Sequence, residues 1–253
     1  AMRNVTRRKF LASSVLAALY GVSGAGAAQP PGQQSTPWRN WSGSVVANPA
    51  GRFSPSSEHQ LADFLASTRG QLRPVGAGHS FTPLVPTEGH LLVLDQLTGL
   101  LSYDSSANTA CFAAGTRLSD MGAPLARAGQ AAINLPDIDR QTLAGATSTA
   151  THGTGIDFKC LSGYVTELRL ITPSGEVHEL TNRSESGMFD AARVGLGALG
   201  IVTRITMQNT ARYRLKQTTW VEKTSDLLKD FDRCPLSTTN PAEHPCTGRR
   251  VGL

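Results

Sequence analysis

The sequence has few of the residue patterns that build metal or thiol redox sites. Its four cysteines never form a C-x-x-C pair, and its six histidines never stand at a metal-ligand spacing such as H-E-x-x-H. The apolar run near the N-terminus, from Phe10 to Val22, has only 13 residues and is interrupted by Ser13, Ser14 and Gly21. A helix that crosses a bilayer needs about 20 apolar residues. The sequence therefore predicts no metal site, and this run is too short to span a membrane.

Acidic residues are missing from the start of the chain, since the first one is Glu58. Cations, by contrast, gather there at Arg3, Arg7, Arg8 and Lys9. Subtracting these four charges from the net charge of +5 leaves the rest of the chain at +1. A nucleic-acid-binding domain carries a basic surface that neutralises phosphates. The near-neutral body therefore predicts no nucleic-acid partner.

The basic N-terminus is typical of an export signal. Arg7 and Arg8 precede the short apolar run, which ends in the small-residue step Ala25-x-Ala27. The adjacent arginines resemble the twin-arginine class of signals. We expect a twin-arginine-type signal peptide over residues 1–28 and a linker rich in Pro, Gly and Gln over residues 29–37. The twin-arginine export machinery would be a partner, and the protein would be periplasmic, either free or associated with the membrane.

The body of the chain mixes helical and strand periodicities. Ser57 followed by Gln60 forms a capping-box pattern ahead of a helical apolar stripe, and a second stripe follows Thr116. Alternating or continuous apolar runs predict strands at 72–75, 91–94, 101–104, 109–114, 165–172, 177–180 and 201–207. Short strands and hairpins with a few helices predict an α+β domain rather than a regular βαβ winding. Cys111 and Cys160 lie in this region, either paired or, as the sequence favours, as two small core residues.

The last part of the chain changes character. A helix begins near Leu227, but residues 234–253 contain three prolines and no periodicity. We expect a domain over residues 38–210, the start of a truncated second domain over 211–233, and an irregular tail over 234–253. A frame change or truncation explains the tail better than a native disordered segment does.

One glycine motif is misleading. Gly195, Gly197 and Gly200 match G-x-G-x-x-G, which in a Rossmann fold follows a strand and opens a helix. Here a helical segment precedes the motif, and the strand at 201–207 follows it. The order is reversed, so a nicotinamide site of the Rossmann type is not expected.

Two other small-residue segments favour a ligand site. Gly76 and Gly78 follow a predicted strand, where a bare backbone can turn its N–H groups toward a phosphate, although a simple tight turn has the same pattern. The stretch from Thr142 to Gly155 is rich in Gly, Ala, Ser and Thr and would bury little apolar area. Such residues suit a place where the backbone closely approaches a ligand.

These segments together resemble the vanillyl-alcohol-oxidase/p-cresol-methylhydroxylase (PCMH) family of flavoproteins, and within it the alditol oxidases and the L-gulonolactone and D-arabinono-1,4-lactone oxidases. The resemblance covers roughly residues 38–207. It implies a two-subdomain PCMH-type FAD-binding domain whose substrate (cap) domain is largely missing. The matching segments are Asn40–Gly43, Arg73–Phe81, Leu143–Gly145 with Thr151–Gly155, and Gly197–Thr203.

The resemblance also implies roles for individual residues. His79 would be joined covalently to the 8α-methyl carbon of FAD, and Pro136 stands where the family places a residue that controls access of oxygen. The other residues that would contact the cofactor are Pro74, Val75, Gly76, Ala77, Gly78, Ser80, Asp137, Thr142, Gly145, Ser148, Thr149, Ala150, Thr151, Ile201 and Val202.

The chemistry implied by the resemblance is oxidation of a CH–OH group in a sugar lactone or polyol. A hydride would pass to flavin N5, and the electrons would then pass to O2 or another acceptor. The catalytic residues would lie in the C-terminal domain, so none is assigned here. Two alternatives remain: a flavin-binding fragment without activity, and a periplasmic binding protein without a cofactor.

Overall fold

The computed structural model describes residues 36–155, 157–183, 186–214, 221 and 223–229. The predicted signal peptide (1–28), most of the linker (29–37) and the tail (234–253) lie outside the described residues, so these assignments stay predictions. Among the described helices, none is long and apolar enough to cross a membrane.

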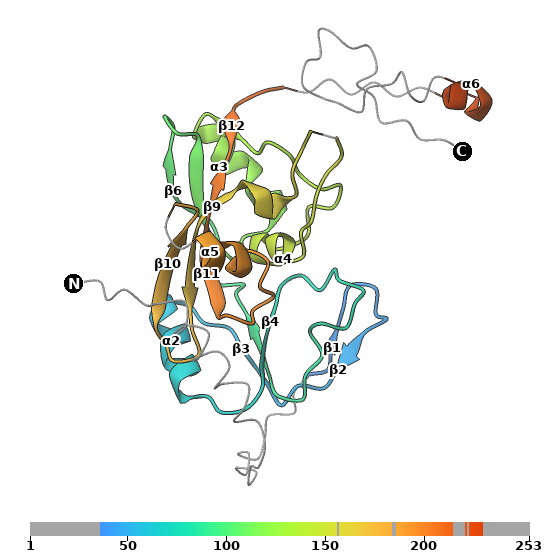
Figure 1. Cartoon of the computed structure of the whole chain (residues 1–253). Coiled ribbons are helices and arrows are strands. Elements are labelled where there is room, and N and C mark those ends of the chain that lie inside the picture. The colour runs from blue at the N-terminus through green and yellow to red at the C-terminus, as the bar shows by residue number, and fades with distance from the viewer. Residues whose placement is uncertain (1–35, 156, 184–185, 215–220, 222, 230–253) are drawn as a thin grey trace.

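The described chain forms two lobes that stand one above the other in Figure 1. The first lobe (residues 36–95) contains β1 (Trp38–Arg39), β2 (Val46–Ala47), β3 (Gly51–Phe53), α2 (Glu58–Ser67), β4 (Leu72–Val75) and β5 (His90–Val93). The second lobe (residues 100–211) contains β6 (Leu100–Asp104), β7 (Thr109–Ala113), the 3₁₀ helix η1 (Leu118–Asp120), α3 (Gly122–Arg127), β8 (Gln130–Ala131), α4 (Leu143–Ser148), the 3₁₀ helix η2 (Leu161–Tyr164), β9 (Val165–Ile171), β10 (Val177–Thr181), α5 (Ser186–Ala192), β11 (Ile201–Gln208) and β12 (Thr210–Ala211). Helix α6 (Thr224–Lys229) follows the second lobe, near the position where we expected a helix to begin.

The first lobe is built on a three-stranded parallel sheet in the order β3-β5-β4. Helix α2 connects β3 to β4, because parallel strands cannot be joined by a tight turn. The predicted cap is present at the start of α2: the Ser57 hydroxyl accepts a hydrogen bond from the Gln60 N–H at 3.1 Å. The Gln60 side chain accepts from the N–H of Ser56 rather than from that of Ser57. The lobe therefore holds one βαβ unit inside a fold that is otherwise α+β.

The second lobe is built on a five-stranded antiparallel sheet in the order β10-β9-β11-β7-β6. Buried and half-buried residues alternate along β11, as expected for a central strand with one face in the core. The predicted hairpin is formed by β6 and β7. Its turn is closed by the Asp104 carboxylate, which accepts from the N–H groups of Ser106 and Ala107.

Two sequence expectations need refinement. The helical stripe after Thr116 is divided between η1 and α3, although Leu118, Met121 and Leu125 are all buried as the stripe predicts. The stretch that begins at Thr142 was expected to make a poor core, but Leu143 in α4 is fully buried. Helix α4 therefore contributes to the core on one side and leaves its other side for a ligand.

The two cysteines of the described chain do not form a disulfide. Cys111 and Cys160 are both free thiols, and both are half-buried.

A single core joins the two lobes. Leu61 and Leu65 of α2 and Leu92 of β5 belong to the same cluster of buried side chains as Phe112 and Ile205 of the second sheet. The lobes therefore bury apolar surface against each other, and their relative position is fixed by close packing.

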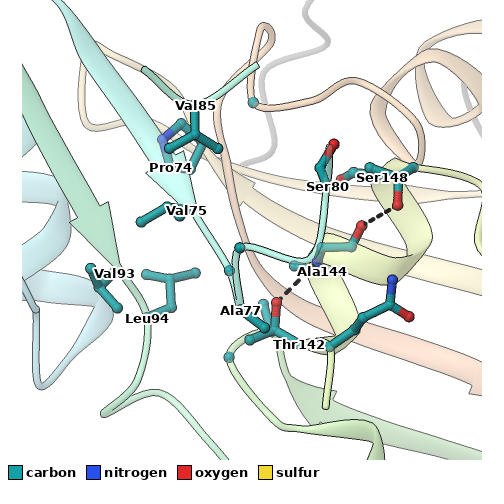
Figure 2. A pocket seen from close by; sticks show the side chains of 18 of the residues that line it. Pro74, Val75, Ala77, Ser80, Val85, Val93, Leu94, Thr142, Ala144 and Ser148 are labelled. Carbon is teal, nitrogen blue, oxygen red and sulfur yellow. Dashed lines mark hydrogen bonds between the residues drawn. The ribbon is translucent and has the colours of Figure 1, made fainter. Parts of the chain in front are cut away.

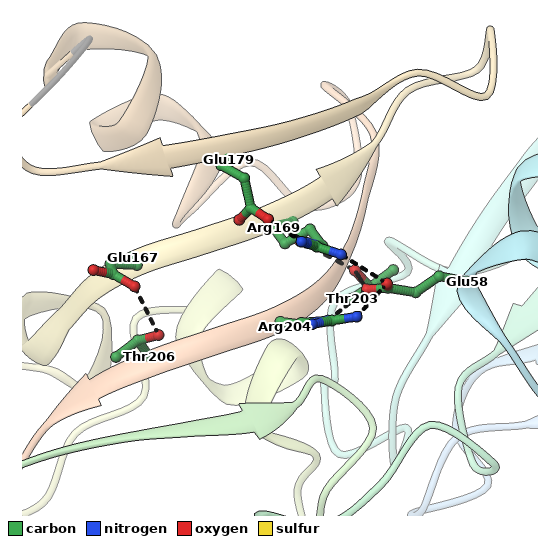
Figure 3. A network of polar contacts seen from close by, with 7 residues as sticks. All are labelled: Glu58, Glu167, Arg169, Glu179, Thr203, Arg204 and Thr206. Carbon is green, nitrogen blue, oxygen red and sulfur yellow. Dashed lines mark hydrogen bonds and ion pairs between the residues drawn. The ribbon is translucent and has the colours of Figure 1, made fainter. Parts of the chain in front are cut away.

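A polar network also connects the lobes through the first residue of α2 (Figure 3). The Glu58 carboxylate accepts hydrogen bonds from the Thr203 hydroxyl at 2.6 Å, from Arg204 at 2.6 and 2.9 Å, and from Arg169 at 3.0 Å. Burial raises the pKa of Glu58, but the hydrogen bonds from Arg204, Thr203 and Arg169 outweigh it, so the pKa is lowered overall. Arg169 is also paired with Glu179 on β10, which lies within the second lobe.

We predict that Glu58→Gln lowers the free energy of unfolding by about 1–3 kcal/mol at neutral pH, because a charged acceptor shared by three donors is lost. A carboxyl whose pKa is lowered on folding stabilises the protein above its unfolded pKa and loses that contribution as the pH falls through the folded value. Urea denaturation at neutral pH and at about pH 3 should therefore show the difference from wild type shrinking in acid.

Glu179→Gln is the matched control. It removes the more exposed partner of Arg169 within one lobe and should cost less than about 1 kcal/mol. If the two variants lost equal free energy of unfolding at neutral pH, the Glu58 contact between the lobes would have no special role in stability.

Candidate cofactor site

A cavity of about 660 Å³ lies where the two lobes meet. The first lobe contributes the end of β4, the loop after it and the end of β5. The second lobe contributes the segment after β7, helix α4 and the turn that leads into β11. In Figure 2 the loop that carries Ala77 and Ser80 runs beside the helix that carries Ala144 and Ser148. The cavity is therefore a slot with one wall from each lobe.

The loop after β4 lines the slot and carries a row of backbone donors without a protein acceptor. The N–H groups of Ala77, Gly78, His79 and Ser80 donate to no acceptor among the described residues, although these four residues line the cavity. Gly78 has a φ of +69°, a backbone conformation that side chains with a Cβ rarely adopt. Successive N–H groups in such a turn form a concave anion-binding surface. The loop can therefore hold a phosphate or pyrophosphate without a cationic side chain.

The loop approaches α4 closely because Gly76 lacks a side chain. A Cβ at Gly76 would overlap the Thr142 hydroxyl and would lie 3.7 Å from the Cα of Gly145. The Thr142 hydroxyl is held in place, since it caps α4 by accepting from the Gly145 N–H at 3.2 Å. Glycine at position 76 is thus a requirement of this approach.

The G-x-G-x-x-G motif at 195–200 does not act as the dinucleotide-binding motif of a Rossmann fold. It lies between α5 and β11, which is the reversed order expected from the sequence. A Cβ at Gly197 would overlap the ring of Pro74, and Gly200 has a φ of +148°. These glycines let the chain pass β4 and bring Ile201 and Val202 to the cavity wall.

His79 lies in the middle of the donor row. Burial and the positive charge of Arg117, which also lines the cavity, lower the pKa of the His79 imidazole. The ring stacks on Trp41 with a centroid distance of 5.3 Å and an angle of 23° between the planes. The lowered pKa favours the neutral imidazole, in which one ring nitrogen carries a lone pair.

Most of the predicted site residues come together in this cavity. Those that line it are Pro74, Val75, Gly76, Ala77, Gly78, His79, Ser80, Thr142, Gly145, Ser148, Thr149, Ile201 and Val202. Asp137, Ala150 and Thr151 lie outside its lining, as does Pro136. The Thr151 hydroxyl accepts a hydrogen bond at 3.2 Å from the side chain of Gln141, which does line the cavity. Ala150, between Thr149 and Thr151, has a φ of +51°.

Several lining residues were assigned no individual role from the sequence. The charged and amide groups are Arg73, Asp95, Arg117, Asp120 and Gln141, and an apolar wall is formed by Phe81, Pro83, Leu84, Val85, Val93 and Leu94. Arg117 follows Gly115 and Thr116 after β7, and a single arginine in such a place carries no local signal in the sequence. Among the described residues, no cluster of three or more His, Cys, Asp or Glu side chains could hold a metal ion.

The cavity fits FAD. The row of free N–H groups suits the pyrophosphate, the apolar wall suits flat rings, and the small residues of α4 leave room beside the loop. The fold and the cavity together define a two-lobe FAD-binding domain of the PCMH type.

Comparison with known proteins agrees with this class. The sequence model of the family described as "FAD binding domain" matches residues 49–181. L-gulono-1,4-lactone dehydrogenase of Mycobacterium tuberculosis is 40% identical over 181 residues, which cover 70% of this chain and 42% of that protein. L-gulonolactone oxidase of Bos taurus is 29% identical, with 79% of this chain and 46% of that protein covered. The chain thus spans less than half the length of these relatives.

Solved structures with the same fold have low sequence identity. Cholesterol oxidase from Brevibacterium sterolicum matches with a TM-score of 0.64 at 20% identity, covering 74% of this chain and 40% of that one. Alkyldihydroxyacetonephosphate synthase matches with a TM-score of 0.58 at 20% identity, covering 63% and 31%. The chain belongs to the vanillyl-alcohol-oxidase/p-cresol-methylhydroxylase family of FAD-binding proteins, and it is similar in sequence to sugar-lactone oxidases and dehydrogenases.

We predict that Gly76→Ala weakens FAD binding at least tenfold, since the added methyl group pushes the donor loop away from Thr142. Titration of the full chain with FAD, followed by flavin fluorescence, measures the change. Removing the opposing group in the double variant Gly76→Ala/Thr142→Ala should restore part of the affinity.

Gly122→Ala is the control, because its Cβ would meet no atom within 4 Å. It should bind FAD as the wild type does. A Gly76→Ala variant with unchanged affinity would refute the steric argument.

Proposed function

We propose that the cavity holds FAD joined covalently to His79, and that the protein uses it to oxidise a CH–OH carbon of a sugar lactone. The observation that carries the proposal is the place of His79 on the wall of the slot, within a row of residues whose N–H groups have no acceptor among the described residues. FAD supplies, when bound, a two-electron acceptor for the oxidation.

The chain's own residues would bind FAD and orient it in the slot. The N–H groups of residues 77–80 would hold the pyrophosphate, because oriented amide dipoles stabilise an anion inside a slot better than water does. Gly145, Ser148 and Thr149 of α4 would lie along the opposite wall. Partial burial and the nearby positive charge of Arg117 lower the pKa of the His79 imidazole, which favours the unprotonated, nucleophilic ring.

Formation of the covalent link would be an oxidation. One imidazole N–H bond of His79 and one C–H bond of the 8α-methyl group would be replaced by a single N–C bond. The two protons and two electrons given up would be taken by dioxygen, which would become hydrogen peroxide.

The substrate class rests on the relatives, whose names specify L-gulono-1,4-lactone, L-gulonolactone and D-arabinono-1,4-lactone. We propose a lactone of this size as substrate and either O2 or another electron acceptor as the oxidant, since the relatives include both oxidases and dehydrogenases. No catalytic base is assigned.

We predict that L-gulono-1,4-lactone or D-arabinono-1,4-lactone bleaches the flavin absorbance of the FAD-loaded protein without oxygen only weakly, because the resemblance places the substrate-binding groups in the C-terminal domain, and that xylitol and sorbitol do so more slowly still. Readmitting air and measuring peroxide then distinguishes O2 from another acceptor. Absence of bleaching by every lactone would contradict the proposed activity while leaving the cofactor site intact.

We predict that His79→Ala abolishes covalent flavin while leaving FAD bound reversibly, because the loop N–H groups remain. Flavin fluorescence in a denaturing gel reports the covalent fraction, and filtration of the native protein reports the reversible fraction. His152→Ala, a histidine outside the cavity lining, is the control and should keep the covalent flavin. Fluorescence that persists in the His79→Ala band would refute the attachment site.

A further inference from the structure

The segment around Asn40 and Trp41 braces the loop that carries His79. This segment follows β1 and matched the family without a role being assigned to it. It contacts the loop on both sides of the histidine: the Trp41 N–H donates to the Gly78 carbonyl at 2.8 Å, and the Asn40 side-chain amide donates to the Ser80 carbonyl at 3.1 Å. The two carbonyls that flank His79 in sequence are therefore fixed by two adjacent residues.

Asn40 is itself held firmly. Its side chain is 5% exposed and also donates to the hydroxyls of Ser42 and Ser44 at 3.1 and 3.2 Å. Its Oδ1 atom accepts from the Val45 N–H at 3.0 Å. Residues 40–45 thus form a turn around the buried Asn40 amide. Because the same amide also bonds the Ser80 carbonyl, this turn restricts the motion of the loop.

Trp41 contacts the imidazole ring itself. The indole is 66% exposed, does not line the cavity, and stacks on His79 at 5.3 Å with an angle of 23°. A half-exposed histidine would otherwise turn about its side-chain bonds between several ring orientations. A stacked indole on one face restricts that rotation and keeps the ring nitrogens in one place.

We propose that Trp41 is a positioning residue for covalent attachment of FAD, which fixes the plane of the His79 imidazole while the Asn40 amide fixes the loop. The inference rests on the proposed attachment at His79. A nucleophile that folding already holds in the reactive orientation reacts faster, because no side-chain rotation has to be frozen during the reaction. The affinity for the cofactor need not change. The role therefore predicts an effect on the rate of attachment and none on reversible binding.

The test follows attachment in the full chain, prepared without flavin and then mixed with FAD in air. Covalent flavin is measured over time by gel fluorescence. Trp41→Ala should slow attachment by about 10- to 100-fold, and Trp41→Phe, which keeps a ring to stack, should restore it to within about threefold. Tyr103→Ala removes another exposed aromatic side chain, from β6 in the second lobe, and should leave the rate unchanged.

Reversible affinity is measured separately in the His79→Ala background, with and without Trp41→Ala. The two dissociation constants should agree within about twofold. A large loss of affinity on adding Trp41→Ala would overturn the inference, since Trp41 would then shape the cavity. An attachment rate in Trp41→Ala equal to that of the wild type would also overturn the inference.

A further outcome separates the inference from the proposed function. If the wild-type chain binds FAD but never attaches it, the proposed link at His79 fails, and the inference fails with it. If the wild type attaches FAD and Trp41→Ala does so equally fast, the attachment stands and only the positioning role is refuted.

Discussion

The site depends on one close approach between two backbones. The loop after β4 lies against the start of α4, and this is possible only because position 76 has no side chain to meet the Thr142 hydroxyl. The next four residues of the loop line the slot, and their N–H groups donate to no acceptor among the described residues. Free backbone donors inside a protein are costly unless a ligand or water satisfies them. These donors suit an anion, and they are the basis of the proposed pyrophosphate site beside His79.

The rest of the fold keeps the two walls at a fixed separation. A shared apolar core holds the lobes together, and the Glu58 carboxylate joins α2 to two strands of the second sheet. Thr203 and Arg204, which bind that carboxylate, follow directly after Ile201 and Val202 on the cavity wall. The polar network thus acts at one edge of the slot, where a small shift of β11 would change its width. Close packing makes such shifts discrete rather than gradual.

Local patterns in the sequence predicted much of the fold, because side-chain periodicity and turn chemistry act over short distances. The strand at 72–75, the Ser57 cap and the alternation along β11 follow from those rules. The parallel sheet of the first lobe does not follow from local rules, since β3 pairs with β5, a strand nearly forty residues further along the chain. In the site, the glycine loop was recognisable as a motif. Arg117 was not, because a single arginine after a strand carries no local signal, and Asp137 turned out to lie outside the wall.

Hydrogen–deuterium exchange of the loop amides, with and without FAD, tests the central claim most directly. The account predicts that the N–H groups of residues 77–80 exchange rapidly in the free protein, since no protein acceptor protects them, and slowly once FAD is bound. The start of α4 should gain protection less, because its Gly145 amide is already capped. Slow exchange in this loop before FAD is added, or exchange that FAD does not change, would contradict the account.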